Sequence, residues 1–344
     1  MPRLRLLLTL LVIAAAALWR AHLPYYDGPA SDHFDGRHFF MPVPLEAKGL
    51  WDVLLWRLQA ETAQWPESLP VERDLPPARI DDEALRVSFV GHATLLLQTG
   101  RLNILTDPVW SERASPVPFV GPRRVRAPGV AFEDLPPIDL VVVSHSHYDH
   151  MGLPTLRRLA AEHDPLFVMP LGNERIFAPD GARIQTLDWW QAADLPGGGR
   201  VHAVPVRHWS RRGLFDRNKA LWGGFVLDLP GGPIYFAGDT GFGDGRVFRA
   251  AAARFGEFRL ALLPIGAYEP RWFMADQHIN PDEAVRAHQL LNARQSLGMH
   301  FGTFQLTDEA IDQPLIDLAA ALAVQAVPAT QFFTLPVGGS VELR

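Results

Sequence analysis

Three imidazoles and one carboxylate are packed into six consecutive residues near the middle of the chain. They belong to His145, His147, Asp149 and His150. Neutral imidazole and carboxylate are good ligands for zinc and other divalent metals. Side chains two positions apart, as in His145 and His147, can converge on one ion, while Asp149 and His150 can turn toward a second. The cluster therefore predicts a metal centre for two ions, which can share a bridging hydroxide.

The composition restricts both the donors and the chemistry. The chain has 13 histidines and no cysteine among its 344 residues. This excludes thiolate zinc fingers, iron–sulfur clusters, disulfide scaffolds and cysteine nucleophiles. The sequence also lacks the G-x-S-x-G elbow of many serine hydrolases. Histidine and carboxylate must hold any metal, and a metal-activated water suits a chain without a protein nucleophile.

The elements around the cluster give it a position in the fold. The apolar run 138–143 predicts a buried strand immediately before it, and Leu153–His163 predicts a helix just after it. The cluster is therefore expected on a loop at the carboxyl end of a strand, where α/β folds commonly place their sites.

Three further side chains of metal-ligating type occupy the same kind of position. Each follows an apolar run: His208 after Val201–Val206, Asp239 after Ile234–Ala237, and His300 after 297–299. A lone histidine in such a place is usually structural, but four loops with the same placement favour one shared metal centre. The histidines without this context are read as structural residues: His22, His33, His38, His163, His202 and His288.

Short apolar runs that alternate with helical segments predict an α/β fold. Further strands are expected at Val87–Val90, Leu95–Gln98, Asn103–Thr106, Leu166–Met169, Phe225–Leu227 and Leu260–Pro264. Further helices are expected over residues 50–60, Val247–Phe255, Pro281–Leu291 and Pro314–Val324. The third of these begins with a capping box at Asn280 and Glu283. This mixture predicts a sandwich with sheets inside and helices outside.

The N-terminal segment, residues 1–22, predicts a signal peptide or a membrane anchor helix. Arg3 and Arg5 precede an apolar run from Leu6 to Trp19, which is the order of a secretory signal or signal anchor. The positive charges favour placing the rest of the chain outside the cytoplasm. We therefore expect a membrane-associated protein that faces the periplasm from the inner membrane, or an exported one.

The rest of the chain divides into two parts by composition. Residues 23–80 predict a linker with a helix that packs on the core, and residues 81–344 predict the catalytic domain. The formal net charge is −6, from 32 Lys+Arg and 38 Asp+Glu, which argues against nucleic acid as a partner. The nearest basic group to the ligands, Arg123, Arg124 and Arg126, is read as a solvated loop or as a contact for a lipid headgroup.

The ligand pattern resembles the metallo-β-lactamase fold and, within it, the N-acylphosphatidylethanolamine-hydrolysing phospholipase D group. The metal motif specifies only the superfamily, whereas the long match from Pro264 to Met274 is specific to the phospholipase-like group. The resemblance covers about residues 85–305. The other matching segments are residues 91–94, 105–108, 113–116, 135–139, 187–190, 208–209, 236–241, 277–278, 282–286 and 300–304.

The resemblance implies an αββα sandwich and a complete ligand set. One zinc would be held by His145, His147 and His208, the other by Asp149, His150 and His300, with Asp239 as the bridge. Mn²⁺ or Fe are alternatives to zinc. His92 and Asp107 would orient the ligands. Asp149 and His278 are the catalytic residues implied, with His278 near the substrate phosphate.

Two of these positions have a plainer interpretation from the residues alone. His278 reads equally as an exposed residue just before the cap at Asn280, and Asp107-Pro108 reads equally as a turn.

The activity implied is a dizinc phosphodiesterase that converts N-acylphosphatidylethanolamine-type phospholipids to phosphatidic acid and N-acylethanolamine. The alternatives are a lactonase or other ester hydrolase of the same fold, and a zinc protein that binds lipid without turnover. The expected partners are a phospholipid or small-molecule substrate and a membrane, and the sequence leaves the oligomeric state open.

Overall fold

The computed structural model describes residues 23–45, 48–80, 84–195 and 197–343. The predicted signal or anchor segment, residues 1–22, lies outside the described residues. Within the described ranges, no helix combines the length and the apolar character needed to cross a bilayer.

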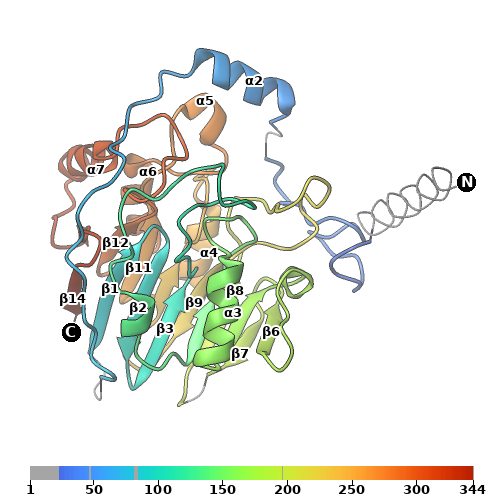
Figure 1. The fold of residues 1–344 in the computed structure, drawn as a ribbon, viewed down its shortest axis with the longest axis vertical. Helices are drawn as coiled ribbons and strands as arrows, with labels where there is room; N and C mark the ends of the chain where they lie inside the picture. The colour runs from blue at the N-terminus through green and yellow to red at the C-terminus, as the bar shows by residue number, and fades with distance from the viewer. Residues whose placement is uncertain (1–22, 46–47, 81–83, 196, 344) are drawn as a thin grey trace, which may run out of the picture.

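Two seven-stranded sheets form the centre of the molecule (Figure 1). The first sheet has the order β14-β1-β2-β3-β4-β5-β6, antiparallel from β14 to β3 and parallel from β3 to β6. Its strands are β1 (Leu85–Gly91), β2 (Thr94–Thr99), β3 (Leu102–Thr106), β4 (Leu140–Val142), β5 (Leu166–Pro170), β6 (Arg183–Leu187) and β14 (Ser340–Leu343).

The second sheet mirrors this arrangement. Its order is β13-β12-β11-β10-β9-β8-β7, parallel from β13 to β10 and antiparallel from β10 to β7. Its strands are β7 (Ala192–Asp194), β8 (Arg200–Val204), β9 (Gly224–Asp228), β10 (Ile234–Phe236), β11 (Leu260–Pro264), β12 (Ser296–Met299) and β13 (Phe332–Phe333).

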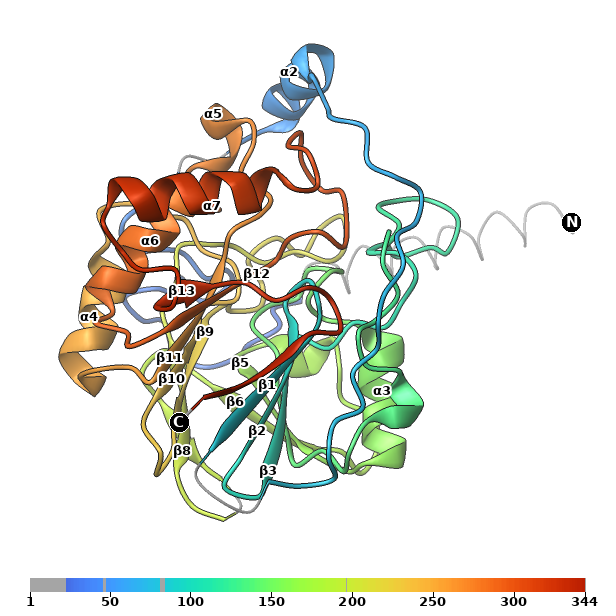
Figure 2. The ribbon, with the colours of Figure 1, turned by 90° about the vertical axis from the view of Figure 1, so that its left-hand side faces the viewer.

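Helices cover the outer faces of the two sheets, so the layers are αββα, as the sequence predicts (Figure 2). The helix α3 (Leu153–Glu162) lies on the first sheet. The helices α4 (Arg246–Phe255), α6 (Pro281–Leu290) and α7 (Gln313–Val324) lie on the second. Two further helices, α2 (Leu50–Gln59) and α5 (Arg271–Met274), sit together at one end of the sandwich (Figure 1).

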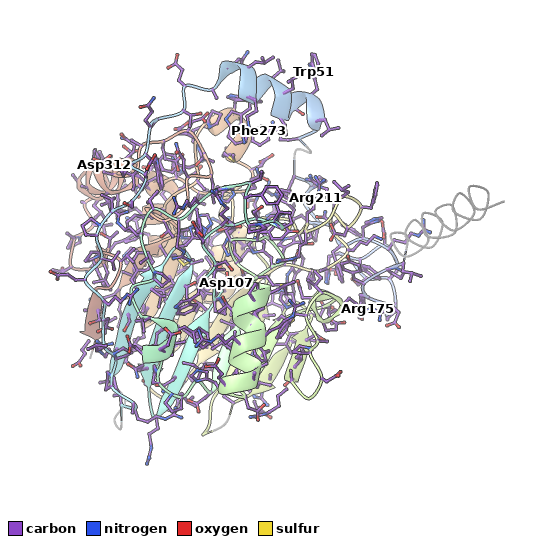
Figure 3. The ribbon with its side chains drawn as sticks, viewed as in Figure 1. Trp51, Asp107, Arg175, Arg211, Phe273 and Asp312 are labelled. Carbon is purple, nitrogen blue, oxygen red and sulfur yellow. The ribbon has the colours of Figure 1, made fainter. Side chains whose placement is uncertain are left out.

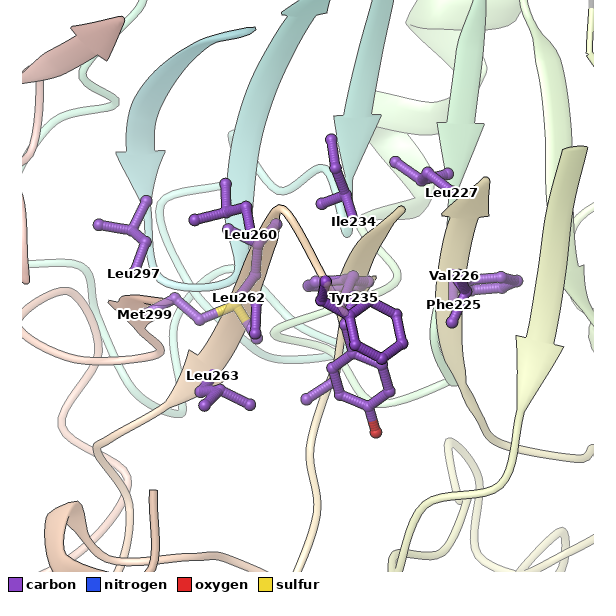
Figure 4. Packing of buried hydrophobic residues seen from close by; sticks show 14 of the residues in the cluster. Phe225, Val226, Leu227, Ile234, Tyr235, Leu260, Leu262, Leu263, Leu297 and Met299 are labelled. Atoms are coloured by element: carbon purple, nitrogen blue, oxygen red, sulfur yellow. The ribbon is translucent and has the colours of Figure 1, made fainter. Parts of the chain in front are cut away.

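The main core lies between the sheets and beneath the helices of the second sheet (Figure 4). Strand β11 is buried along its whole length, which is typical of a strand covered on both faces. Its Leu260 and Leu262 pack in one cluster with Tyr235 of β10. Burying a leucine side chain contributes about 1.5–3 kcal/mol, so this apolar interior fixes the strands whose ends carry the site.

The predicted helices and strands are present, with ends that differ by at most a few residues. The capping box of α6 is also confirmed, because the Asn280 side chain accepts from the Glu283 amide and the Glu283 carboxylate accepts from the Asn280 amide. The sequence reading missed the edge strand β6. Its residues are alternately exposed and partly buried, so no apolar run marks it.

The N-terminal part of the described chain is anchored at several points. Phe34 and Phe39 are buried beside Trp222, and His33 contacts Asp188 through its Nε2 atom at 2.7 Å. The helix α2 packs through Trp56 on Phe273 of α5, with ring centroids 4.9 Å apart. The segment predicted as a linker therefore follows the surface of the sandwich.

Candidate metal centre

Every predicted ligand lies at one edge of the sandwich, and strand direction explains why. The strands β1, β3 and β4 of the first sheet run parallel to one another, as do β8, β10 and β12 of the second. The residues that follow their carboxyl ends are His92 after β1, Asp107 after β3, 145–150 after β4, His208 after β8, Asp239 after β10 and His300 after β12. Both sheets thus present their carboxyl-end loops at one site, where Figure 3 labels Asp107.

One group of ligand atoms comes from His145, His147, His208 and Asp239, and these atoms all lie within 4.8 Å of one another. The Nδ1 atom of His147 is 2.8 Å from Nε2 of His145 and 3.3 Å from Nε2 of His208. The Oδ2 atom of Asp239 is 3.8 Å and 3.7 Å from the Nε2 atoms of His145 and His208. These are the residues predicted to hold the first ion, together with the predicted bridge.

A second group lies directly beside the first. The Nε2 atom of His150 is 3.1 Å from Nε2 of His300 and 3.3 Å from Oδ2 of Asp149. Asp239 reaches this group too, with 3.1 Å between its Oδ2 and His150 and 3.1 Å between its Oδ1 and His300. Asp239 therefore contacts both groups. His92 completes the second cluster, with Nε2 at 2.9 Å from Oδ2 of Asp149.

The two groups fit bound metal ions. A tetrahedral ion with bonds of about 2.0–2.1 Å holds its ligand atoms about 3.3 Å apart, close to the spacings in both groups. Ring nitrogens face each other at His145–His147 and His150–His300, 2.8 and 3.1 Å apart. Two nitrogens at such distances need a cation or a proton between them. Among the described residues, the buried Oδ1 atom of Asp239 lies 3.1 Å from Nε2 of His300 but forms no well-directed hydrogen bond.

Hydrogen bonds behind the ligands fix their orientation. His150 donates from Nδ1 to Oδ2 of Asp107 at 2.6 Å, and the Ser144 amide donates to Oδ1 of the same carboxylate at 2.6 Å. His208 donates from Nδ1 to the backbone oxygen of Gln277 at 3.0 Å. Such bonds leave the other ring nitrogen free to bind a metal. The position of Asp107 thus agrees with an orienting role rather than a plain turn.

The backbone at this edge is held in an uncommon conformation. His92, Asp107 and His300 have φ values of 59°, 36° and 65°, in a region that non-glycine residues rarely adopt. The His300 amide donates to the His92 carbonyl at 2.8 Å, which ties the loop after β12 to the loop after β1. Strained residues cluster at functional sites because the surrounding structure holds them there.

Burial and neighbouring charges set the protonation of the ligands. Burial holds the pKa values of His145 and His208 well below the usual range, which leaves these imidazoles neutral. Although burial opposes its ionisation, Asp239 has a pKa well below its usual range because His150 and His300 lie beside it. Asp239 in turn outweighs the burial of His300 and raises its pKa to about 9. The carboxylates therefore attract positive charge to this site.

His278 and Trp209 border the ligands. The Nδ1 atom of His278 is 4.0 Å from Oδ2 of Asp239, and its side chain is only 13% exposed, so it is not an exposed residue at a helix cap. Burial lowers its pKa to about 4. The ring of Trp209 lies 4.5 Å from that of His147, centroid to centroid. Sequence reasoning gave no role to Trp209, Ser144 or Gln277, although each adjoins a predicted site residue in the chain.

The basic group Arg123–Arg126 is not a solvated loop as a whole. The Arg124 guanidinium donates to the backbone oxygens of Ser111 and Val109 at 2.8 and 2.7 Å, and Arg126 donates to that of Gly302. Burial lowers the pKa of Arg124 to about 10. Both side chains fasten loops beside the site through backbone oxygens, which corrects the solvated-loop interpretation for these two residues. A contact with a lipid headgroup stays a prediction.

The comparisons with known proteins agree with this geometry. A family profile described as a beta-lactamase superfamily domain matches residues 102–301. The chain belongs to the metallo-β-lactamase superfamily. Within this superfamily it is 38% identical over 283 residues to N-acyl-phosphatidylethanolamine-hydrolyzing phospholipase D 1 of Caenorhabditis elegans, covering 79% of each chain. It is 37% identical over 219 residues to the mitochondrial protein of that name from Saccharomyces cerevisiae, covering 62% of this chain and 46% of the yeast protein.

Solved structures share the fold of this chain. A metallo hydrolase from Ignicoccus hospitalis aligns with a TM-score of 0.57 at 19% identity, covering 76% of this chain and 99% of the other. An isothiocyanate hydrolase from Delia radicum gut bacteria aligns with a TM-score of 0.57 at 18% identity, covering 74% and 98%. The family and its relatives show that the chain is a metal-dependent hydrolase with an α/β fold of two sheets.

Proposed function

We propose that the protein is a dizinc phosphodiesterase that cleaves N-acylphosphatidylethanolamine-type phospholipids to phosphatidic acid and N-acylethanolamine. The observation that carries this proposal is the position of Asp239, whose carboxylate contacts both groups of metal-ligating atoms. The names of the worm and yeast relatives support the substrate class.

The roles of the residues follow from their positions. His145, His147 and His208 would hold one zinc, Asp149, His150 and His300 the other, and Asp239 both; Mn²⁺ or Fe could replace zinc with the same donors. Two such ions supply an activated water near neutral pH and offset the charge of a phosphoryl group.

The chain itself then positions the reacting groups. His92 holds the Asp149 carboxylate in place through the 2.9 Å contact. His278 faces the site from the side of the second sheet as an imidazole that burial keeps neutral. A neutral imidazole can donate one hydrogen bond to a phosphoryl oxygen, which suits the predicted contact of His278 with the substrate phosphate.

The test uses purified, zinc-loaded protein and a side-by-side panel of N-acylphosphatidylethanolamine, other phosphodiesters and lactones. We expect release of phosphatidic acid, and we expect Asp239→Ala to lose both bound zinc and turnover. Asp228→Asn, which changes an exposed carboxylate on β9, is the matched control. Full turnover by metal-free Asp239→Ala protein would overturn the proposal. Hydrolysis of lactones alone would assign the lactonase alternative, and no turnover across the panel would assign the lipid-binding alternative.

We also propose that residues 1–22 hold the protein at a membrane, facing the periplasm from the inner membrane or exported from it. The apolar run that follows Arg3 and Arg5 supports this location. Cell fractionation of the full chain and of a chain starting at residue 23 tests it. Equal recovery of both forms in the soluble cytoplasmic fraction would contradict the location.

A further inference from the structure

A pocket of about 290 Å³ opens between the start of α2 and the loop that follows β8. Its apolar lining comes from Leu45, Leu50, Val53 and Phe273. None of the predicted metal ligands lines it. In Figure 3, Phe273 and Arg211, both of which line the pocket, lie between α2 and the region of Asp107.

The inner wall of this pocket is also the outer wall of the metal centre. That wall includes Trp209 and Gln277. The ring of Trp209 lies against that of His147, and the backbone oxygen of Gln277 accepts the hydrogen bond from His208. The Trp209 indole nitrogen also donates to the side-chain oxygen of Gln277. One layer of side chains, which includes Trp209 and Gln277, therefore separates the pocket from the predicted ligands.

The helix α2 leaves most of its apolar side chains open to solvent. Leu50, Trp51 and Leu58 are 88%, 69% and 73% exposed, whereas Trp56 alone on this helix is buried, against Phe273. A surface helix normally turns its apolar stripe toward the core. Here the apolar surface begins in the pocket at Leu50 and continues outward, and exposed apolar surface of this kind marks a binding site.

Three cationic side chains line the pocket: Lys48, Arg211 and Arg217. The Arg217 guanidinium lies 4.2 Å from the ring centre of Trp209. In the described part of the chain, neither arginine forms an ion pair with a carboxylate. Asp276 also lines the pocket, but its carboxylate contacts Arg207 at 3.4 Å. The rim therefore favours an anionic group, and the interior favours an apolar one.

We propose that this pocket binds an acyl chain of the phosphodiester substrate, while Arg211 and Arg217 attract its anionic headgroup toward the metal centre. The inference rests on the proposed function and adds to it a place for the chain. The apolar wall from α2 and Phe273 would hold the chain, and the two arginines would attract the charged headgroup. Trp209 lies both in the pocket wall and against His147, which places the chain close to the reacting phosphate.

The experiment measures kcat/KM of the zinc-loaded protein on phosphodiesters with one headgroup and acyl chains of increasing length, presented as monomers. Burying one methylene gains about fourfold in binding, so kcat/KM is expected to rise steeply with chain length until the pocket is filled. Val53→Trp fills the pocket and is expected to lower the ratio of long-chain to short-chain kcat/KM at least tenfold. Leu75→Trp adds the same side chain at an exposed position outside the pocket lining and outside α2, and is expected to keep the wild-type ratio.

The other outcomes separate the alternatives. A Val53→Trp protein with the wild-type ratio overturns the proposal. If, in addition, Leu58→Asp weakens binding to phospholipid vesicles, α2 meets a bilayer surface instead of a single chain.

Combined Arg211→Gln and Arg217→Gln substitutions are expected to raise KM several-fold at low salt and to flatten its salt dependence; an unchanged KM overturns the headgroup role.

A binding measurement keeps this inference separate from the proposed reaction. Calorimetry with dodecyl phosphate as the probe measures the affinity of the pocket for an acyl chain without any turnover. If the wild-type protein hydrolyses no phosphodiester but binds dodecyl phosphate more tightly than Val53→Trp does, the proposed function fails and the pocket assignment stands. Equal binding by the two proteins overturns the pocket assignment.

Discussion

The Nδ1 atom of His150 lies 2.6 Å from Oδ2 of Asp107, and both side chains are fully buried. This contact joins the loop after β4 to the loop after β3 and fixes the face that His150 presents to His300. The same carboxylate accepts from the amide and the hydroxyl of Ser144. Asp107 thus sets the orientation of a ligand without belonging to either predicted ligand set.

Asp107→Asn is expected to weaken zinc binding by 10- to 100-fold, because an amide is a poorer acceptor for the His150 N–H than a carboxylate. Competition with a chromophoric chelator measures the affinity. Asp180→Asn, an exposed site, is the control. Wild-type affinity in the Asp107 variant, with its fold intact, would show that His150 does not need this partner.

Loss of a ligand that belongs to one group should remove one ion more readily than the other. His208→Ala leaves Asp149, His150 and His300 in place, so we expect about one zinc per chain where the wild type binds two. His300→Ala should give the complementary result. Metal analysis after gel filtration counts the ions, and two tightly held ions in either variant would contradict the assignment of that histidine.

The ion pair of Asp74 with Arg86 should make stability depend on pH. Burial opposes ionisation of Asp74, but hydrogen bonds from Arg86 and Ser88 lower its pKa. A carboxylate whose pKa is lower in the folded than in the unfolded state stabilises the folded protein at pH values above the unfolded-state pKa of about 3.9. This contribution is lost as the pH falls through the folded-state pKa.

Asp74→Asn is therefore expected to lower the free energy of unfolding at pH 7 by about 3 kcal/mol. At pH values below the folded-state pKa of Asp74, the free energies of unfolding of the variant and the wild type should be nearly equal. Urea unfolding monitored across this pH range measures the effect, with the exposed Glu67→Gln as control. A loss of equal size at every pH would mean that the charge of Asp74 is not what stabilises this contact.

Trp56 is the attachment of α2 to the rest of the molecule. Its ring packs on Phe273, and its indole nitrogen donates to the Asp308 carboxylate at 2.7 Å. Trp56→Ala is expected to cost about 3–5 kcal/mol locally and to expose α2 to proteases. Limited proteolysis with mass spectrometry locates the new cuts, and Trp51→Ala, on the exposed side of the same helix, is the control. Unchanged protection in the Trp56 variant would show that α2 is held by other contacts.

The common position of the predicted ligands could be foreseen because local signals and topology agree. Each apolar run ends just before a histidine or an aspartate, and parallel strands bring those ends to one edge, as with Asp239 after β10 and His300 after β12. Long-range partners could not be predicted in this way. Nothing in the sequence indicates that Ser144 turns toward Asp107, or that Arg124 is occupied by backbone oxygens.

The fold shows the same division between local and distant information. The edge strands β6 and β7 and the short β13 and β14 lack long apolar runs and form because a neighbouring strand offers hydrogen bonds. The place of α2 is likewise set by distant contacts of Trp56, with Phe273 and with Asp308, which no periodicity within the helix indicates.

The symmetry of the centre has a mechanical consequence. Each predicted ligand set takes two side chains from loops of the first sheet and two from loops of the second. In one set, the first sheet supplies His145 and His147 and the second supplies His208 and Asp239. In the other set, the first sheet supplies Asp149 and His150 and the second supplies His300 and Asp239. Bound ions would therefore act as cross-links between the two layers, in addition to the apolar core that joins them. Chelation should loosen the carboxyl edge of one layer against the other, so that the cations that enable hydrolysis also hold the two halves of the protein in register.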